Sequence, residues 1–399
     1  MVKTSLLNKT NKHISFLSNI SIPELRAIIT KRNAKKLSKI NRILLWINYV
    51  FIVSLVCSMA SKYISPNHFW VLAFFGLAFP IILFINVVFV IYWFAQFRIQ
   101  ASFSFIAILL SAKTCLGFIQ FDVTTDTISN KDVKIMSYNS MLFDLYNWRK
   151  NKESRNLILT SLAEENPDIL CLQEFYTSEE KGDFNNIDTV IGLLNAKNHH
   201  VEFTTTLRTN DHWGIATFTK YPIIKKGKIE FNTSANNLCI YTDVLIKKDT
   251  FRIYNMHLQS IRFNKADYKF LDQIKNDTTD TKDELEKSKT ILRRLKIAFV
   301  KRATQADVIA AHISNCKYNV IVCGDFNDTP ASYVYNTIRG DLKDAFIESG
   351  SGFEQTYAGN FPKFRIDYIL HSKTIKSKNY HRLTETLTDH YPIVSYISY

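Results

Sequence analysis

Two long stretches without a charged residue constrain this chain more than any other feature. No Asp, Glu, Lys or Arg occurs in residues 43–61, and none occurs in residues 63–97. A helix needs about 20 apolar residues to cross a bilayer, and both stretches are long enough. A buried helical hairpin of a soluble protein is the alternative, but it rarely needs two such runs. We therefore expect a membrane domain at residues 43–121, with transmembrane helices at about 43–61, 69–96 and 101–121.

The third apolar segment decides on which side of the membrane the rest of the chain lies. Lys113 interrupts it, and a central lysine costs roughly 2.5–3.5 kcal/mol on insertion scales. Ten Lys/Arg residues lie in residues 1–42, and basic flanks stay cytoplasmic. We expect a multi-pass protein of the cell (inner) membrane, with residues 1–42 as a basic cytoplasmic segment. The region from residue 122 onward is extracytoplasmic if the third segment crosses, as we expect, and cytoplasmic if it does not. Pro80 is expected to kink the second helix.

The formal net charge of +14 belongs to the N-terminal part of the chain. Residues 1–121 contain 13 Lys/Arg and one acidic residue, Glu24, whereas residues 122–399 contain 37 Lys/Arg and 35 Asp/Glu. The C-terminal region is thus nearly neutral and lacks the excess of basic residues typical of nucleic-acid-binding domains. Six cysteines in 399 residues are too few for a disulfide scaffold.

Beyond residue 122, short apolar runs alternate with polar loops, which is typical of a domain rich in strands. Strands are expected at 133–139, 168–174, 214–224, 237–246, 251–259, 319–328, 365–372 and 391–397, and helices at 152–166 and within 265–315. Strands outnumber helices, and no internal repeat is visible. We expect one α/β domain over residues 122–399.

Polar residues recur where these apolar runs end, at the rim of a sheet where loops commonly build sites. They are Asn139, Glu174, His257, Asp325, Asn327, Asp367, Asp389 and His390. Alternate residues of an extended chain point the same way, so we expect Asp325 and Asn327 to face one ligand while Phe326 enters the core.

The side-chain types in this set limit the reactions that it can support. It holds four carboxylates, two carboxamides and two histidines, but no Ser or Cys nucleophile. Carboxylate and amide oxygens suit a hard cation, Mg²⁺ or Mn²⁺. Each residue alone has an ordinary explanation, such as a turn or a helix cap. The whole set together fits metal-assisted hydrolysis of a phosphate ester.

Seven short motifs follow one another in an order that is recognisable. They are SYN (137–139), LQE (172–174), GIATFTKYP (214–222), MHLQS (256–260), GDFND (324–328), RIDYI (365–369) and TDHYP (388–392). In this order the chain resembles the endonuclease/exonuclease/phosphatase superfamily over about residues 132–399. The resemblance implies an α/β fold, a deoxyribonuclease-like two-sheet α/β sandwich with outer helices and a site at one edge. Here an N-terminal bundle of transmembrane helices would precede it.

The same resemblance implies ligands for the cation and the phosphate. Glu174 is expected to be the principal Mg²⁺ ligand, with Mn²⁺ as a substitute, and Asp389 is expected to join it, directly or through water. Asn139 and Asn327 are expected to hold phosphate oxygens or a water on the metal.

The remaining residues of the set are implied to move protons and to position groups. Asp325 is expected to position or help to activate the attacking water. His390 is expected to act as general base or phosphate contact, oriented by Asp367. His257 is expected to contact phosphate or protonate the leaving oxygen. A histidine at 257, where repair nucleases usually have tyrosine, indicates the deoxyribonuclease and sphingomyelinase branches.

Three functions remain open from the sequence. The favoured one is a membrane-anchored, Mg²⁺-dependent phosphoric ester hydrolase that cleaves a phosphodiester or phosphomonoester, preferably a lipid headgroup or small phosphoester, by in-line attack of activated water. The alternatives are a membrane-anchored nuclease and a non-catalytic binding module on the same fold. The expected partners are the lipid bilayer and a phosphoester substrate. Nucleic acid is a less favoured partner, and no protein partner is indicated.

Overall fold

The computed structural model describes residues 21–121, 127–151, 153–180, 184–231, 237–261, 267, 270, 281–359 and 363–399. The chain forms two compact units, one of residues 1–57 and 78–112, the other of residues 58–77 and 113–399. The first 20 residues of the predicted basic segment lie outside the described residues.

The N-terminal region is helical, as its composition predicts, but its helices are divided differently from the prediction. They are α2 (Ile22–Ala34), α3 (Lys39–Ala60), α4 (Pro66–Phe69), α5 (Val71–Leu77), α6 (Phe79–Ala95) and α7 (Ala101–Cys115). Among the described residues, α3 alone is long and apolar enough to cross a bilayer, and α5 with α6 qualifies only as a pair interrupted at Ala78. Instead of the expected kink at Pro80, the helix is interrupted before it, and Pro80 lies in the first turn of the new helix α6. α7 has 15 residues, fewer than the ~20 that a span needs, so the prediction of three spanning helices is not confirmed.

The helices of the smaller unit bury polar groups and expose apolar ones. Asn48 is fully buried; its amide donates to Ser104 Oγ at 2.6 Å, and its carbonyl oxygen accepts from Trp93 Nε1 at 3.0 Å. By contrast, Phe84 is 67% exposed and Leu110 is 68% exposed. Water-soluble helices show the reverse distribution, whereas helices in lipid bury their polar groups against one another.

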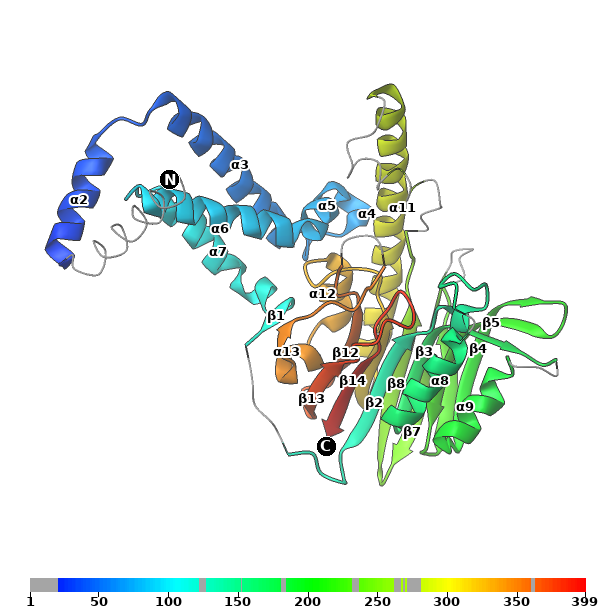
Figure 1. Cartoon of the computed structure of the whole chain (residues 1–399). Coiled ribbons are helices and arrows are strands. Elements are labelled where there is room, and N and C mark those ends of the chain that lie inside the picture. The colour runs from blue at the N-terminus through cyan, green and yellow to red at the C-terminus, as the bar shows by residue number, and fades with distance from the viewer. Residues whose placement is uncertain are drawn as a thin grey trace, which may run out of the picture. The chain divides into compact units, whose positions relative to one another are not determined.

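The larger unit contains two six-stranded sheets packed face to face, with helices outside them (Figure 1). The first sheet has the order β10 (Lys343–Asp344), β12 (Asp367–His371), β9 (Asn319–Asp325), β8 (Asp249–His257), β7 (Leu238–Ile246), β6 (Ile223–Ile229). The second has the order β13 (Lys376–Arg382), β14 (Ile393–Ser398), β2 (Val133–Asn139), β3 (Ile169–Ser178), β5 (Asp211–Thr219), β4 (Asn198–Leu207). A short pair, β1 (Ile119–Gln120) and β11 (Gly352–Phe353), completes the strands of the described residues. The two-sheet sandwich expected from the resemblance is confirmed.

Three apolar clusters hold these layers together. One lies between the sheets and includes Ile135, Ile253 and Ile321. A second packs the first sheet under α11 (Thr281–Ser314) and α12 (Tyr333–Arg339). The third packs the second sheet under α8 (Ser154–Glu165) and α9 (Asn186–Leu194), with η1 (Met141–Asp144) at its margin. α13 (Ala345–Ser349) contributes Phe346 to the cluster between the sheets.

Strand alternation carries the polar strand ends to the inner face of the sandwich. On β9, Ile321 and Cys323 face the other sheet, so Asp325 has the same orientation one step beyond the apolar core. The strands on either side follow the same alternation, because Asp325 pairs with Asp367 of β12 and with His257 of β8. On the facing sheet, Asn139 continues the inward series of Ile135 in β2. The site therefore begins where the core between the sheets ends.

A buried amide pair ties the two sheets together beneath that edge. Gln173 of β3 donates to Asn255 Oδ1 of β8 at 2.7 Å, and Asn255 donates to the Ala216 carbonyl of β5 at 2.8 Å. Both amides are fully buried, and a buried hydrogen bond whose partner is lost leaves an unsatisfied polar group.

Replacing Asn255 with Ala should therefore lower the free energy of unfolding by about 2–4 kcal/mol, because it opens a cavity and leaves Gln173 and a carbonyl unsatisfied. Denaturant unfolding of the full chain measures this. The exposed Asn156 of α8 is the matched control, and Asn156→Ala should change stability by less than about 0.5 kcal/mol. Equal effects of the two substitutions would contradict the structural role given to Asn255.

Candidate active site

Asp325 is the centre of the hydrogen-bond network at this edge. Its carboxylate accepts from Asn139 Nδ2 at 3.1 Å and from the backbone and side-chain N–H groups of Asn327 at 2.8 and 3.1 Å. Asp325 is 1% exposed, so these donors hold a buried carboxylate in one orientation. Phe326 is fully buried in the cluster under α11 and α12, as the alternation in the sequence predicts.

His390 lies between two carboxylates. Its Nδ1 is 3.0 Å from Asp367 Oδ2, and its Nε2 is 3.7 Å from Asp325 Oδ2. Burial lowers the pKa of this imidazole, but the charges of Asp367 and Asp325 outweigh that effect and raise it well above its ordinary value. The two neighbouring carboxylates thus favour the protonated form of His390.

Two threonines hold the His390–Asp367 pair in place. Thr388 Oγ1 accepts from the His390 backbone N–H at 3.0 Å and lies 3.1 Å from the Asn139 carbonyl, to which it donates. Thr356 Oγ1 accepts from the Asp367 backbone N–H at 3.0 Å. Sequence reasoning did not single out either residue; only the place of Thr388 directly before Asp389 and His390 was a signal for it.

Glu174 reaches the site because of an irregularity in β3. Leu170 and Leu172 point outward into the helix-covered cluster, and strict alternation would send Glu174 the same way. The register of β3 with β5 shifts between Leu172 and Phe175, and Glu174 has a φ of +46°. This bulge inserts an extra residue and re-aims the Glu174 side chain.

The Glu174 carboxylate lies near other acidic groups and near a histidine, with no Lys or Arg paired to it among the described residues. His257 Nε2 lies 3.6 Å from Glu174 Oε1 and 3.7 Å from Asp325 Oδ2. Burial, followed by the negative charges of Asp389 and Asp325, raises the pKa of Glu174 to about 7, although His390 acts in the opposite sense. The cluster therefore holds more negative charge than its own positive groups neutralise.

This excess fits a divalent cation. A nearby positive charge would restore the ionised form of Glu174. Ligand atoms of Asp325, Asp367 and His390 also lie within 4.8 Å of one another. Nδ1 of His390 is already hydrogen-bonded to Asp367, so that trio is better suited to proton handling than to ligation. The donor set is mostly oxygen, as Mg²⁺ and Mn²⁺ prefer.

The structure brings seven of the eight predicted residues into one network of contacts, and the eighth, Asp389, is connected to them only through its charge. Asn139, Glu174, His257, Asp325, Asn327, Asp367 and His390 are joined by the contacts above. Asp389 enters through its charge, which acts on Glu174. Asn327 Nδ2 donates to the Leu258 carbonyl at 3.1 Å as well as to Asp325, so it positions Asp325 and keeps no amide hydrogen for phosphate.

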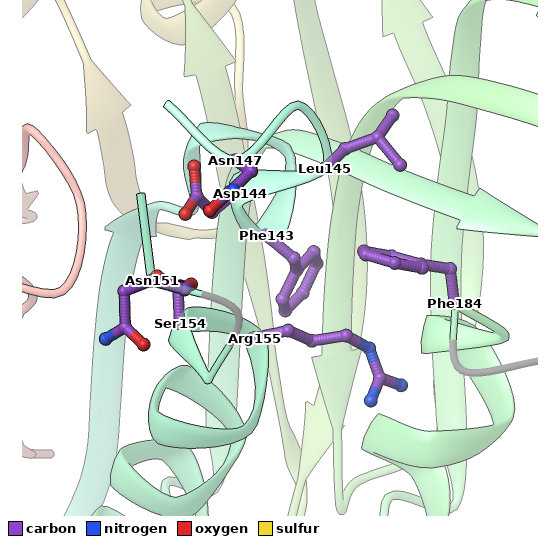
Figure 2. A pocket seen from close by; sticks show the side chains of 8 residues that line it. All are labelled: Phe143, Asp144, Leu145, Asn147, Asn151, Ser154, Arg155 and Phe184. Atoms are coloured by element: carbon purple, nitrogen blue, oxygen red, sulfur yellow. Dashed lines mark hydrogen bonds between the residues drawn. The ribbon is translucent and has the colours of Figure 1, made fainter. Parts of the chain in front are cut away.

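A cavity of about 220 Å³ opens beside the loop that follows Asn139 (Figure 2). The Met141 backbone N–H donates to Asn139 Oδ1 at 3.1 Å, which links this loop to the site. Figure 2 shows Asp144 on one side of the cavity and Arg155 on the other, with Phe143 between them. The Arg155 guanidinium packs over the Phe184 ring at 5.4 Å and donates to an asparagine of α9 at 2.9 Å. The loop that borders the cavity is thus linked to the site, and Arg155 is held by contacts within the fold.

Comparison with known families agrees with this geometry. Residues 136–390 match the model of the Endonuclease/Exonuclease/phosphatase family. The match covers more than half of the chain, which therefore belongs to this family. Its members are typically phosphoesterase and nuclease hydrolases and generally use divalent metals. Residues 41–117 match a second model, described as Domain of unknown function (DUF8431). A comparison with curated proteins gives no match.

Solved structures share the fold at low sequence identity. The human Nocturnin catalytic domain is 20% identical with a TM-score of 0.48, covering 67% of this chain and 93% of its own. Sphingomyelinase C from Streptomyces griseocarneus is 18% identical with a TM-score of 0.44, covering 66% and 99%. A family protein from Bacteroides thetaiotaomicron is 14% identical with a TM-score of 0.46, covering 67% and 94%. These similarities concern the fold alone.

The raised pKa of Glu174 makes a prediction about stability and pH. Folded Glu174 keeps a proton that the unfolded chain, with its ordinary value of 4.5, has lost. Glu174 should therefore contribute a loss of stability to the cation-free chain as pH rises from about 4.5 to about 7, and Glu174→Gln should remove that contribution from the pH profile. Urea midpoints in EDTA at several pH values measure both chains. Identical pH profiles for the two would contradict the environment described for Glu174.

Proposed function

We propose that the chain is a membrane-anchored, divalent-cation-dependent hydrolase of a phosphodiester or phosphomonoester, with a lipid headgroup or small phosphoester as substrate. The observation that carries the proposal is the convergence of Glu174, Asp325, His257 and the His390–Asp367 pair at one sheet edge. This edge combines a cluster of carboxylate oxygens, which can bind a divalent cation, with two histidines, which can donate or accept protons. Metal-assisted attack of water on phosphorus needs both kinds of group.

Each residue of the site then has a part in the reaction. A divalent cation held by Glu174 and assisted by Asp389 would supply charge neutralisation at the phosphate oxygens. Asp325, aligned by Asn139 and Asn327, orients the attacking water and accepts its proton.

The two histidines handle the charge that develops on the phosphate. His390, oriented by the Asp367 carboxylate at its Nδ1, donates in its protonated form from Nε2 to a phosphate oxygen, and its raised pKa favours that form. His257 lies close to both Glu174 and Asp325, from where it protonates the leaving oxygen. No covalent intermediate with the protein is required.

Charge supports a lipid or small phosphoester over nucleic acid. Residues 122–399 are almost balanced in charge, whereas affinity for nucleic acid depends on a strong local excess of Lys and Arg. The alternative is a nuclease that uses the same kind of active site, and the activity test below distinguishes it from the proposed hydrolase.

Membrane anchoring is supported by three observations. α3 is a 22-residue apolar helix of which little is buried, and its neighbours α6 and α7 also expose large apolar side chains. Buried amide and hydroxyl groups between these helices replace the hydrogen bonds that water cannot make in a bilayer.

The full chain in detergent micelles should hydrolyse a phosphoester in Mg²⁺ and lose that activity in EDTA. Sphingomyelin, phosphatidylinositol phosphates, bis-p-nitrophenyl phosphate and plasmid DNA are the substrates to compare. His390→Ala should reduce turnover by roughly 10²–10⁴-fold, because it removes a proton donor and a charge partner. Thermal unfolding should show that the variant remains folded.

The matched control is His381, whose ring contacts Asn379 and Glu165 instead; His381→Ala should keep nearly normal turnover. Cleavage of plasmid DNA without turnover of any lipid or small ester would replace the proposal with a nuclease. A folded chain inactive on all four substrates would support a binding module.

Anchoring makes a separate prediction about location. After cell fractionation the full chain should stay with the membrane through washes at high salt and at alkaline pH, because apolar helices hold it there. A full-length chain that washes off in salt would show that its basic residues, rather than its helices, bind the surface.

A further inference from the structure

A second cavity, of about 160 Å³, lies within the larger unit, where residues 58–77 and 113–121 meet α12 and the loop after β9. Lys62, Lys113 and Arg339 line it, and no Asp or Glu is among its lining residues. None of these three basic residues has a part in the proposed reaction.

The walls of this cavity are held by specific contacts. Ser61 Oγ donates to the Ala331 carbonyl at 2.8 Å, and the Asn336 amide donates to the Lys62 carbonyl at 3.1 Å. A Cβ on Gly117 would come within 2.6 Å of the Pro330 Cβ, so only glycine permits this close approach. These contacts hold the backbone segments that carry the basic side chains in fixed positions.

Within the part of the chain that the structure describes, no Asp or Glu forms an ion pair with the three basic side chains of the cavity. Lys62 is 9% exposed, and its Nζ donates to Thr114 Oγ1, a neutral acceptor, at 2.8 Å. Arg339 Nε is buried and has no hydrogen-bond acceptor among the described residues. Burial and then the charges of Lys113 and Arg339 lower the pKa of Lys62. Burying the Lys62 ammonium beside two other cations is unfavourable, and an anion in the cavity would offset that cost.

We propose that this cavity, which we call the basic pocket, binds a phosphate group through Lys62, Lys113 and Arg339. Phosphate oxygens accept hydrogen bonds from ammonium and guanidinium groups, and three such groups line this one cavity. The group belongs either to a phospholipid headgroup or to a soluble phosphate. α3 ends at Ala60, two residues before Lys62, so a headgroup at the end of an apolar helix lies within reach of the pocket.

The test compares Arg339→Gln and Lys113→Gln with the control Lys317→Gln, which removes an exposed lysine elsewhere. Thermal unfolding of the full chain is followed in neutral detergent with inorganic phosphate at constant ionic strength. It is then followed in nanodiscs of phosphatidylcholine with and without 20% phosphatidic acid. Wild type and Lys317→Gln should gain about 3 °C or more from one of these probes, whereas the pocket variants should gain less than about 1 °C.

A response to inorganic phosphate identifies a soluble ligand, and a response only to phosphatidic acid identifies a lipid headgroup. Without either probe, Arg339→Gln should melt no lower than wild type, since it relieves repulsion between like charges. Lys113 is exposed, so Lys113→Gln keeps the test valid even if Arg339→Gln disturbs packing. Equal responses of Lys113→Gln and Lys317→Gln to both probes would overturn the proposal. The readout is binding, so its result does not depend on the hydrolase activity.

Discussion

Negative charge gathered at one edge of two packed sheets is the constraint on which the rest of the site depends. Asp325 and Asp367 are almost fully buried, and carboxylates taken out of water need donors or opposite charges. The asparagine amides and His390 compensate part of this negative charge. The pKa of Glu174, raised to about 7, indicates that the compensation is incomplete. A cation at Glu174 would complete the balance, and the same charges would then act on a phosphate group.

The fold supplies this edge by means of two sheets that are held in register. The apolar cluster between them ends at the strand positions where Asn139, His257, Asp325 and Asp367 begin the polar layer. Beneath that layer, the Gln173–Asn255 hydrogen bond joins the sheets across the core. Because these four side chains and Glu174 lie on strands rather than on long loops, they have little conformational freedom to lose when a substrate binds.

Much of this arrangement follows from the sequence, and the exceptions have physical reasons. Alternation along GDFND correctly predicts that Phe326 enters the core while Asp325 faces the site. The same rule fails for Glu174, because a bulge depends on pairing with β5 and leaves no local signal. Thr388 and Asn255 act through distant partners, which the sequence does not reveal. In the N-terminal region, hydropathy predicts helices but not the break at Ala78 or the short length of α7.

The central claim is that Glu174 binds a divalent cation within a phosphoesterase site. Anomalous diffraction from crystals of the full chain grown with Mn²⁺ tests it most directly. The account predicts a peak about 2.2 Å from a Glu174 carboxylate oxygen, which is lost in Glu174→Gln. A peak held instead by Asp325, Asp367 and His390, with no density near Glu174, would contradict it.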